Sequence, residues 1–173
     1  MRTEILGIGL LVLAMGLLHA GTTYSQAVSF SATVPEFIAV TISPGTISFQ
    51  SNINPTENLT ANTPIVVTNT PYSNVNIKLT LNATDFLSGS DTIQIANLKM
   101  RANETEPAYT YFTSGHAISN SDVVCSPSVY SLDQNCGNMS VDSHVKLWFN
   151  LLVPGGTLAG SYSTNVNIRA DKV

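Results

Sequence analysis

The clearest strand signal in the chain is Val75-Asn-Ile-Lys-Leu-Thr-Leu-Asn82, in which every second residue is apolar. Successive side chains of a β-strand point to opposite faces, so this pattern predicts an antiparallel strand with one buried and one solvated face. The same alternation recurs in residues 162–170, while residues 144–153 carry apolar residues on both faces. We expect 144–153 to be a central strand, joined to 162–170 as a hairpin through the turn at Pro154-Gly-Gly156.

Shorter strands are expected along the rest of the chain. Residues 36–42, 63–69 and 92–101 have strand spacing, the last with the shift of register that a β-bulge produces, and residues 109–113 are a further short candidate. Turns rich in Gly, Pro and Asn separate these segments, and no window after residue 27 shows the i, i+3, i+4, i+7 spacing of a helix. The sequence therefore predicts an all-β protein: a single antiparallel β-sandwich, jelly-roll-like in topology.

The composition excludes two functional classes. The chain has 173 residues, with 7 Lys+Arg against 11 Asp+Glu, and only 10% of its residues are charged. A nucleic-acid-binding surface needs clustered basic residues, which this chain lacks. Intrinsic disorder requires high charge and few apolar residues, whereas 43% of this chain is hydrophobic. Its length suits one folded domain.

The first 27 residues have the organisation of a secretory signal peptide. Arg2 precedes the uncharged run Ile5–Leu18, and Ser25-Gln-Ala27 offers small residues for cleavage before Val28, with Ala20 as a second option. A helix of that length rises about 21 Å, which is short of the ~30 Å bilayer core. We expect residues 1–27 to be removed and residues 28–173 to form the domain. The mature protein is then secreted, extracellular or at the cell surface, without a membrane anchor.

The two cysteines predict a disulfide. Cys125 and Cys136 lie in residues 114–143, the longest stretch without strand periodicity, and in an exported protein such a pair most simply forms one bridge. Their spacing is not that of a C-x-x-C site. His116 and His144, the histidines beyond the signal, lack the H-E-x-x-H or H-x-H spacing of a zinc site. We expect no metal and no cofactor.

No catalytic motif is present. The sequence lacks G-x-S-x-G, its carboxylates form no cluster, and the glycine pair after Pro154 joins two expected strands, so we expect the protein not to be an enzyme. Four N-x-S/T sequons, at Asn58, Asn82, Asn103 and Asn138, are candidates for N-glycosylation. Chance accounts for four sequons in a chain so rich in Asn, Ser and Thr.

The segment that begins the expected mature chain is Val28-Ser-Phe-Ser-Ala-Thr-Val34. Val28, Phe30, Ala32 and Val34 alternate with polar residues, and Pro35 ends the pattern. This arm has two interpretations. It pairs with an edge of its own sandwich, or it fills an open edge of a neighbouring subunit, as in donor-strand complementation, where main-chain hydrogen bonds and alternate side chains hold the donor.

The chain as a whole resembles secreted fibre-forming jelly-roll proteins. The likeness rests on the signal peptide, the arm, the Asn/Thr-rich strands and the closing segment Val153-Pro-Gly-Gly-Thr-Leu-Ala-Gly-Ser-Tyr-Ser-Thr-Asn-Val-Asn-Ile-Arg-Ala170. The similar families are archaeal bundling-pilus and thread subunits and, less closely, bacterial biofilm-matrix proteins of the TasA and camelysin kind. The resemblance implies a homopolymer that grows head to tail by donation of the N-terminal strand. It also implies an extracellular filament used in adhesion or biofilm matrix, with lateral bundling of fibres.

Two other functions remain open from the sequence. The first is a monomeric surface module that binds glycans or envelope proteins through the loop of residues 114–143. The second is a secreted metalloenzyme that uses His116 and His144. Deleting residues 28–34 distinguishes the filament from the binding module, because only the filament depends on the arm for assembly.

Overall fold

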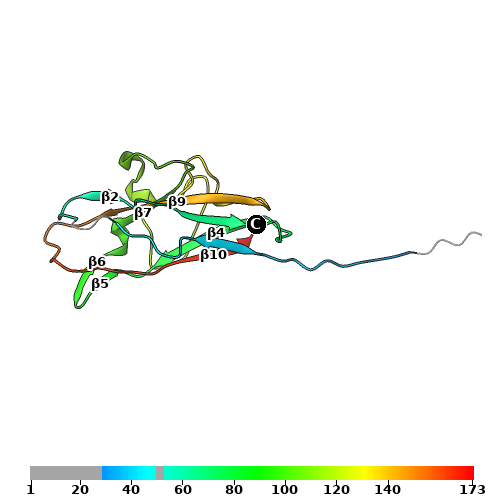
Figure 1. The fold of residues 1–173 in the computed structure, drawn as a ribbon, viewed down its shortest axis with the longest axis horizontal. Coiled ribbons are helices and arrows are strands. Elements are labelled where there is room, and N and C mark those ends of the chain that lie inside the picture. Colours follow the sequence, from blue (N-terminus) through cyan, green and yellow to red (C-terminus); the bar gives the residue numbers. More distant parts are fainter. Residues whose placement is uncertain (1–28, 50–52) are drawn as a thin grey trace, which may run out of the picture. The chain divides into compact units, whose positions relative to one another are not determined.

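The computed structural model describes residues 29–49 and 53–173, and it divides the chain into two units between Val34 and Pro35. The expected signal peptide and Val28 lie outside the described residues. The second unit, Pro35–Val173, contains every strand that the structure assigns. It is an all-β fold of antiparallel sheets packed together, as the strand patterns predict (Figure 1).

The larger sheet has five strands, and β9 lies at its centre. β3 and β2 pair with successive parts of one edge of β9, β7 pairs with the other edge, and β1 lies outside β3. The strands are β1 (Val40–Ser43), β2 (Asn58–Thr60), β3 (Ile65–Asn69), β7 (Leu98–Ala102) and β9 (Ser143–Leu152). The prediction of a central strand at residues 144–153 is confirmed.

The second sheet has the order β10-β4-β8, and a separate two-stranded sheet pairs β5 with β6. These strands are β4 (Ile77–Ala83), β5 (Phe86–Ser88), β6 (Asp91–Ile93), β8 (Val123–Val124) and β10 (Val166–Lys172). The turn between β5 and β6 contains Gly89 at φ 61°, a backbone conformation that glycine adopts without a Cβ penalty.

The expected hairpin between residues 144–153 and 162–170 is wrong. β9 belongs to the larger sheet, whereas β10 pairs along its whole length with β4 in the second sheet. The turn at Pro154 therefore begins a crossing between the sheets. The chain crosses in the same way from β3 to β4, from β7 to β8 and from β8 to β9, an alternation typical of a jelly-roll.

Two further expectations are corrected. Residues 92–101 do not form one bulged strand, because the 3₁₀ turn η1 (Ile95–Asn97) separates β6 from β7. The carboxylate of Asp85 accepts a hydrogen bond of 2.7 Å from the backbone N–H of Ile95, which fixes the start of that turn. The short strand expected at residues 109–113 is replaced by the 3₁₀ turn η2 (Tyr109–Tyr111), followed by η3 (Ser114–His116).

The core lies between the two sheets and is built by the alternating residues. Ile77, Leu79 and Leu81 of β4 are fully buried, as are Leu147 and Phe149 of β9. Burial of one such side chain contributes about 1.5–3 kcal/mol relative to leaving it in water. The outer face of β9 is covered as well, since the indole N–H of Trp148 donates a hydrogen bond of 3.0 Å to the carbonyl of Asn103.

Candidate functional site

One side of the sandwich is closed by residues 117–139, which bridge the two sheets. Ala117 and Ser131 form β-bridges with β7 of the larger sheet. On the other sheet, the N–H of Leu79 donates to the carbonyl of Cys136 at 2.9 Å, and Met139 forms a bridge with Ile77. We call this side the closed seam. Most of the loop of residues 114–143, which shows no strand periodicity in the sequence, therefore lies between the edge of β7 and the edge of β4.

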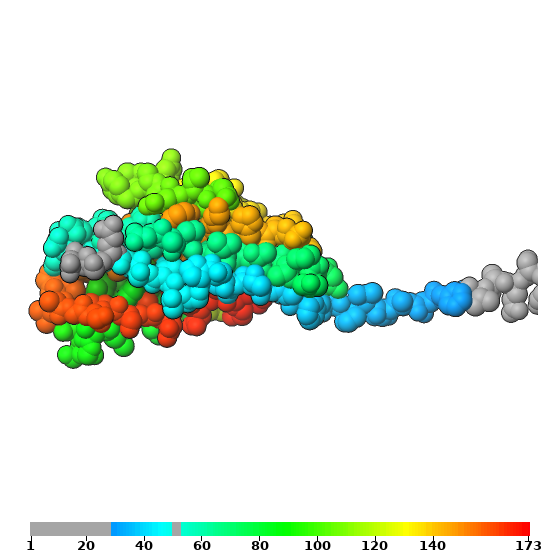
Figure 2. Space-filling model, in the orientation of Figure 1, coloured from blue at the N-terminus to red at the C-terminus, as the bar shows by residue number. Residues whose placement is uncertain are grey.

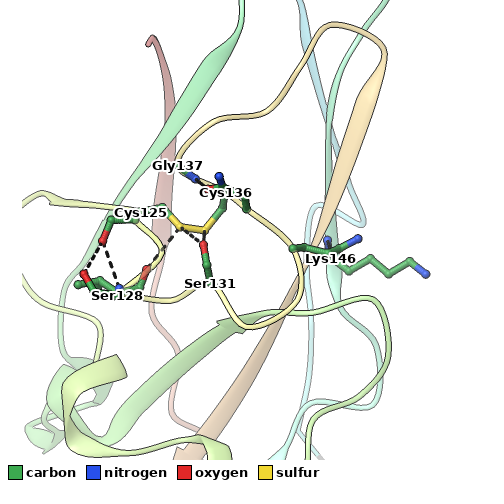
Figure 3. Close-up of a disulfide and its surroundings, with 10 residues drawn as sticks. Cys125, Ser128, Ser131, Cys136, Gly137 and Lys146 are labelled. Atoms are coloured by element: carbon green, nitrogen blue, oxygen red, sulfur yellow. Dashed lines mark hydrogen bonds between the residues drawn. A yellow bond between two sulfur atoms is a disulfide. The ribbon is translucent and has the colours of Figure 1, made fainter.

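A disulfide between Cys125 and Cys136 holds the closed seam together, which confirms the predicted pairing (Figure 3). The Cα atoms are 5.5 Å apart and both residues are buried. The hydroxyl of Ser131 lies between the sulfurs, 3.7 Å from Sγ of Cys125 and 3.6 Å from Sγ of Cys136. Tyr130, fully buried beside them, donates a hydrogen bond to the carbonyl of Ala117, and burial raises the pKa of this phenol to about 12.

The described residues leave the opposite side of the sandwich incompletely covered. It lies between β1 with residues 45–49 on one side and residues 157–165 with β10 on the other, and we call it the open seam. Eleven hydrophobic residues pack against the core while remaining partly exposed. All but Val123 and Val129 come from two parts of the chain, residues 38–53 and residues 162–170, and five of these nine line the hollows described next. These nine are Ile38, Val40, Ile47, Phe49, Ile53, Tyr162, Val166, Ile168 and Ala170.

A groove occupies the part of the open seam that lies between residues 45–49 and residues 157–166, and it ends at the first residue of β10. It consists of two adjoining hollows of about 770 and 190 Å³, which share Ile47, Phe49, Phe86 and Thr164 as lining residues. The buried side chain of Phe149 lines the smaller hollow, so the groove reaches into the core. Figure 2 shows the two walls side by side, residues 40–49 in cyan above residues 160–172 in orange to red.

The start of the domain lies at the other end of β10 from the larger hollow. The side-chain amide of Asn74 donates to the carbonyl of Pro35 at 2.8 Å, and its oxygen accepts from the N–H of Phe37 at 2.7 Å. Glu36 forms an ion pair with Lys172, the last residue of β10. The larger hollow is lined by residues 157–164, which precede the first residue of β10. Figure 1 shows residues 35–40 beside the C-terminus.

The expected donor residues belong to the first unit. None of residues 29–34 belongs to a strand, so a single copy does not show the first interpretation, in which the arm pairs with an edge of its own sandwich. Phe30 is 93% exposed and Val34 is 77% exposed, and Ala32 is exposed as well. Val28 lies outside the described residues. The alternating apolar residues of the arm are thus uncovered in a single copy of the chain.

The outward face of the second sheet is polar. Arg169 pairs with Asp122 at 2.6 Å and with Asp171 at 3.0 Å. A hydrogen bond from Asn82, together with Arg169, holds the pKa of Asp122 below its ordinary value. One face of β10 thus carries polar side chains that are paired with each other or exposed to solvent. The other face is apolar and is turned toward the open seam.

The two histidines have different partners. Nε2 of His116 contacts the guanidinium of Arg101, and its Nδ1 lies 3.0 Å from the hydroxyl of Thr113. Nε2 of His144 is 3.7 Å from a carboxylate oxygen of Glu104. Within residues 29–49 and 53–173, no group of three or more His, Cys, Asp or Glu side chains is arranged to hold a metal ion.

The environment of His116 predicts a pH dependence of stability. Burial, and then the positive charge of Arg101, lower the pKa of His116 below its ordinary value of 6.5. The unfolded chain therefore takes up a proton in a pH range where the folded protein does not, so stability is retained above about pH 6.5 and falls below it. Thermal unfolding should show a smaller loss between pH 7.5 and pH 5 for His116→Gln than for the wild type. An equal loss in both proteins contradicts this assignment.

The sequons differ in accessibility. Asn58 and Asn138 are exposed, whereas Asn82 is half-buried and bonded to Asp122 and to Asn167. Asn103 is buried, and its side-chain nitrogen, the atom that would carry a glycan, donates to the carbonyl of Thr105 at 2.9 Å. The folded protein therefore presents two of the four sequons for modification.

Sequence reasoning missed the residues that line the groove. The alternation of residues 162–170 is visible in the sequence, but it predicted an inward face that is buried, and the structure leaves that face partly exposed. The short alternation Ile47-Ser-Phe49 was also present as a signal. No local pattern shows that these two segments would face each other, because that depends on the crossing after β9.

The fold places the chain among antiparallel β-sandwich proteins. No protein-family model and no curated protein matches it. Among solved structures, it is similar to a family 123 glycoside hydrolase from Clostridium perfringens, with 19% sequence identity and a TM-score of 0.44. That match covers 79% of this chain and 25% of the hydrolase chain, so the chain spans a quarter of the length of that protein. Among its described residues, no helix is long and apolar enough to cross a membrane.

Proposed function

We propose that this chain is a structural subunit of an extracellular filament, which assembles when the N-terminal arm of one copy fills the open seam of the next. The single observation that carries the proposal is the open seam itself. One side of the sandwich is closed by residues 117–139, whereas the other leaves a groove that reaches the core. We interpret the open seam as the place of a strand that the domain itself does not supply. The arm of residues 28–34 has the alternation of a strand and its described residues are uncovered in a single chain, so it is the candidate for that place.

The arm and the groove match in chemistry. The arm offers Phe30, Ala32 and Val34 on one face, with Val28 continuing the pattern, and polar residues alternate with them. The groove has a mixed lining as well, in which the apolar residues include Ile47, Phe86 and Leu151. Burying four apolar side chains and pairing main-chain groups is the binding mode of strand addition. It also covers a sheet edge that otherwise invites aggregation.

The placement of the parts favours a polymer over a closed dimer. The arm is followed by Pro35 and Glu36, and Glu36 pairs with Lys172 at one end of β10. The larger hollow lies beyond the other end of β10. A contact that joins the opposite ends of identical subunits is heterologous, so it cannot form a two-fold dimer and propagates as a fibre unless the rotation between subunits closes a ring. Few charges, 10% of residues, reduce the repulsion between fibres and favour lateral bundling.

The extracellular location and the use in adhesion or biofilm matrix belong to the same proposal. The signal-like residues 1–27 support export, and the Cys125–Cys136 disulfide is typical of an oxidising compartment. The proposed role requires no catalysis. The loop that a glycan-binding module would use lies largely in the closed seam, where its backbone pairs with β4 and β7.

The test is electron microscopy together with size-exclusion chromatography of purified protein that starts at Val28. We expect filaments, and we expect their loss when residues 28–34 are deleted. A monomer at high concentration with the arm intact would overturn the proposal. Circular dichroism of the deleted protein serves as the control, because an unfolded domain could not assemble for a different reason.

A further inference from the structure

Among the described residues, none forms a backbone hydrogen bond with the edge of β10 that faces away from β4, so the main-chain groups of that edge are free to pair within this part of the chain. On the far side of β4, Ile77 exchanges two hydrogen bonds with Met139, of 3.0 and 2.7 Å, and the carbonyl of Leu79 accepts from Cys125 at 2.8 Å. Alternate residues of an antiparallel strand direct their N–H and C=O groups to opposite edges. The residues of β4 that face β10 are therefore Lys78, Thr80 and Asn82.

The register then identifies the outward groups of β10. Lys78, Thr80 and Asn82 lie opposite Asp171, Arg169 and Asn167, in that order. The intervening residues Val166, Ile168 and Ala170 direct their N–H and C=O groups to the free edge. Their side chains are the half-buried apolar ones that pack against the core. A strand added beside them would place its own alternate side chains over the open seam.

The other edges are poorer acceptors. β1 has four residues, β5 and β6 have three each, and the outer edge of β7 is occupied by bridges to Ala117 and Ser131. β10 has seven residues. Protected edges carry proline, a bulge or an inward-pointing charge, and residues Val166–Ala170 have none of these on the side that faces the core.

We infer that the free edge of β10 is the acceptor for the arm of a second copy of this chain, and that the arm runs antiparallel to β10. This inference rests on the proposed function. In a head-to-tail contact, the arm enters at the end of the larger hollow, so Val34 lies near the start of β10 and Phe30 lies deeper, toward Lys172. An arm that folded back from Pro35 onto its own β10 would run parallel to it, with Val34 near Lys172 instead.

Hydrogen exchange tests which edge is used. Filaments of the chain starting at Val28 are exchanged, quenched and dissolved for NMR, and compared with a monomeric Phe30→Asp, Val34→Asp variant. The amides of Val166, Ile168 and Ala170 should be protected only in filaments, whereas those of Asn167, Arg169 and Asp171 should be protected in both. Protection that appears on β1 rather than β10 overturns the inference and leaves the proposed function standing.

Cysteine pairs test the direction. Val34→Cys, combined with a cysteine at Thr164 or Val166, should form disulfides between subunits in filaments. Combined with a cysteine at Ala170 or Lys172, it should not. Crosslinks only to the latter pair would show a parallel arm and contradict the inference. If no preparation forms arm-dependent polymers, the proposed function fails and the acceptor assignment fails with it.

A proline substitution gives an independent measure. Ile168→Pro removes an N–H that faces the free edge and spares the ladder to β4, whereas Ile168→Val keeps that N–H at similar volume. Loss of hydrogen bonding and the added ring should raise the critical concentration for assembly by at least about tenfold for the proline variant alone. Equal assembly by the two variants, with equal thermal stability, would overturn the assignment to β10.

Discussion

Replacing Phe30 and Val34 by aspartate is expected to abolish filament formation without unfolding the domain. Both side chains are largely exposed in the single chain, so the change removes no contact from the core of Pro35–Val173. In the assembled state the same positions would lie over the open seam, against partly exposed apolar residues of β10 such as Val166 and Ile168. Loss of two buried apolar side chains, about 4 kcal/mol together, raises the critical concentration about 1000-fold, and the buried charges raise it further.

The opposite face of the arm supplies the matched control. Ser31→Asp with Thr33→Asp adds the same charge to the same segment, on side chains that would face solvent in the filament. Assembly of this variant should stay within about tenfold of the wild type, because exposed charges contribute little. Sedimentation of polymer across a concentration series measures both variants. Equal loss of assembly in the two would show that net charge, and not side-chain burial, controls the process.

Removing the disulfide is expected to destabilise the domain substantially. Cys125 and Cys136 are 11 residues apart, and a bridge over so short a loop contributes about 3 kcal/mol in the chain-entropy model. For a domain of this size, the melting temperature should fall by roughly 6–12 °C in a Cys125→Ala, Cys136→Ala variant. Differential scanning calorimetry measures this shift, and Ser128→Ala, an exposed change in the same loop, provides the control.

The Cys125→Ala, Cys136→Ala variant also tests which of the two seams is the assembly site. Because the disulfide lies in the closed seam, its loss should leave assembly intact below the lowered melting temperature. A binding module that uses this loop predicts the reverse result, in which function is lost while the arm is unaffected. Filaments that disappear in the folded disulfide variant would therefore count against the assignment of the open seam as the assembly site.

Local patterns predicted the elements better than their partners. The alternation of residues 75–82 and the apolar run 144–153 specified β4 and β9, because side-chain period and burial are properties of each segment. The hairpin of β9 with β10 was wrong because turn residues after Val153 are compatible with either a tight hairpin or a crossing to the other sheet. Which occurs depends on β4, whose edge is available to β10.

For a related reason, the sequence predicted one part of the candidate site, the arm, but not the other part, the groove. The arm has a signal of its own, since Phe30 and Val34 alternate with polar residues beyond any element that could cover them. The groove has none, because Ile47 and Tyr162 belong to segments more than a hundred residues apart that meet only after the chain has crossed between sheets. A groove between two segments is a property of the folded sandwich, and no single stretch of the sequence indicates it.

The ion pair between Glu36 and Lys172 has a mechanical consequence. It ties the second residue after the arm to the last residue of β10, and Asn74 anchors the neighbouring backbone to the same end of the domain. If β10 also receives the incoming arm, tension on a filament enters and leaves each subunit along a single strand. The pull is then parallel to β10, so the hydrogen bonds along its edge are loaded together in shear rather than opened one at a time.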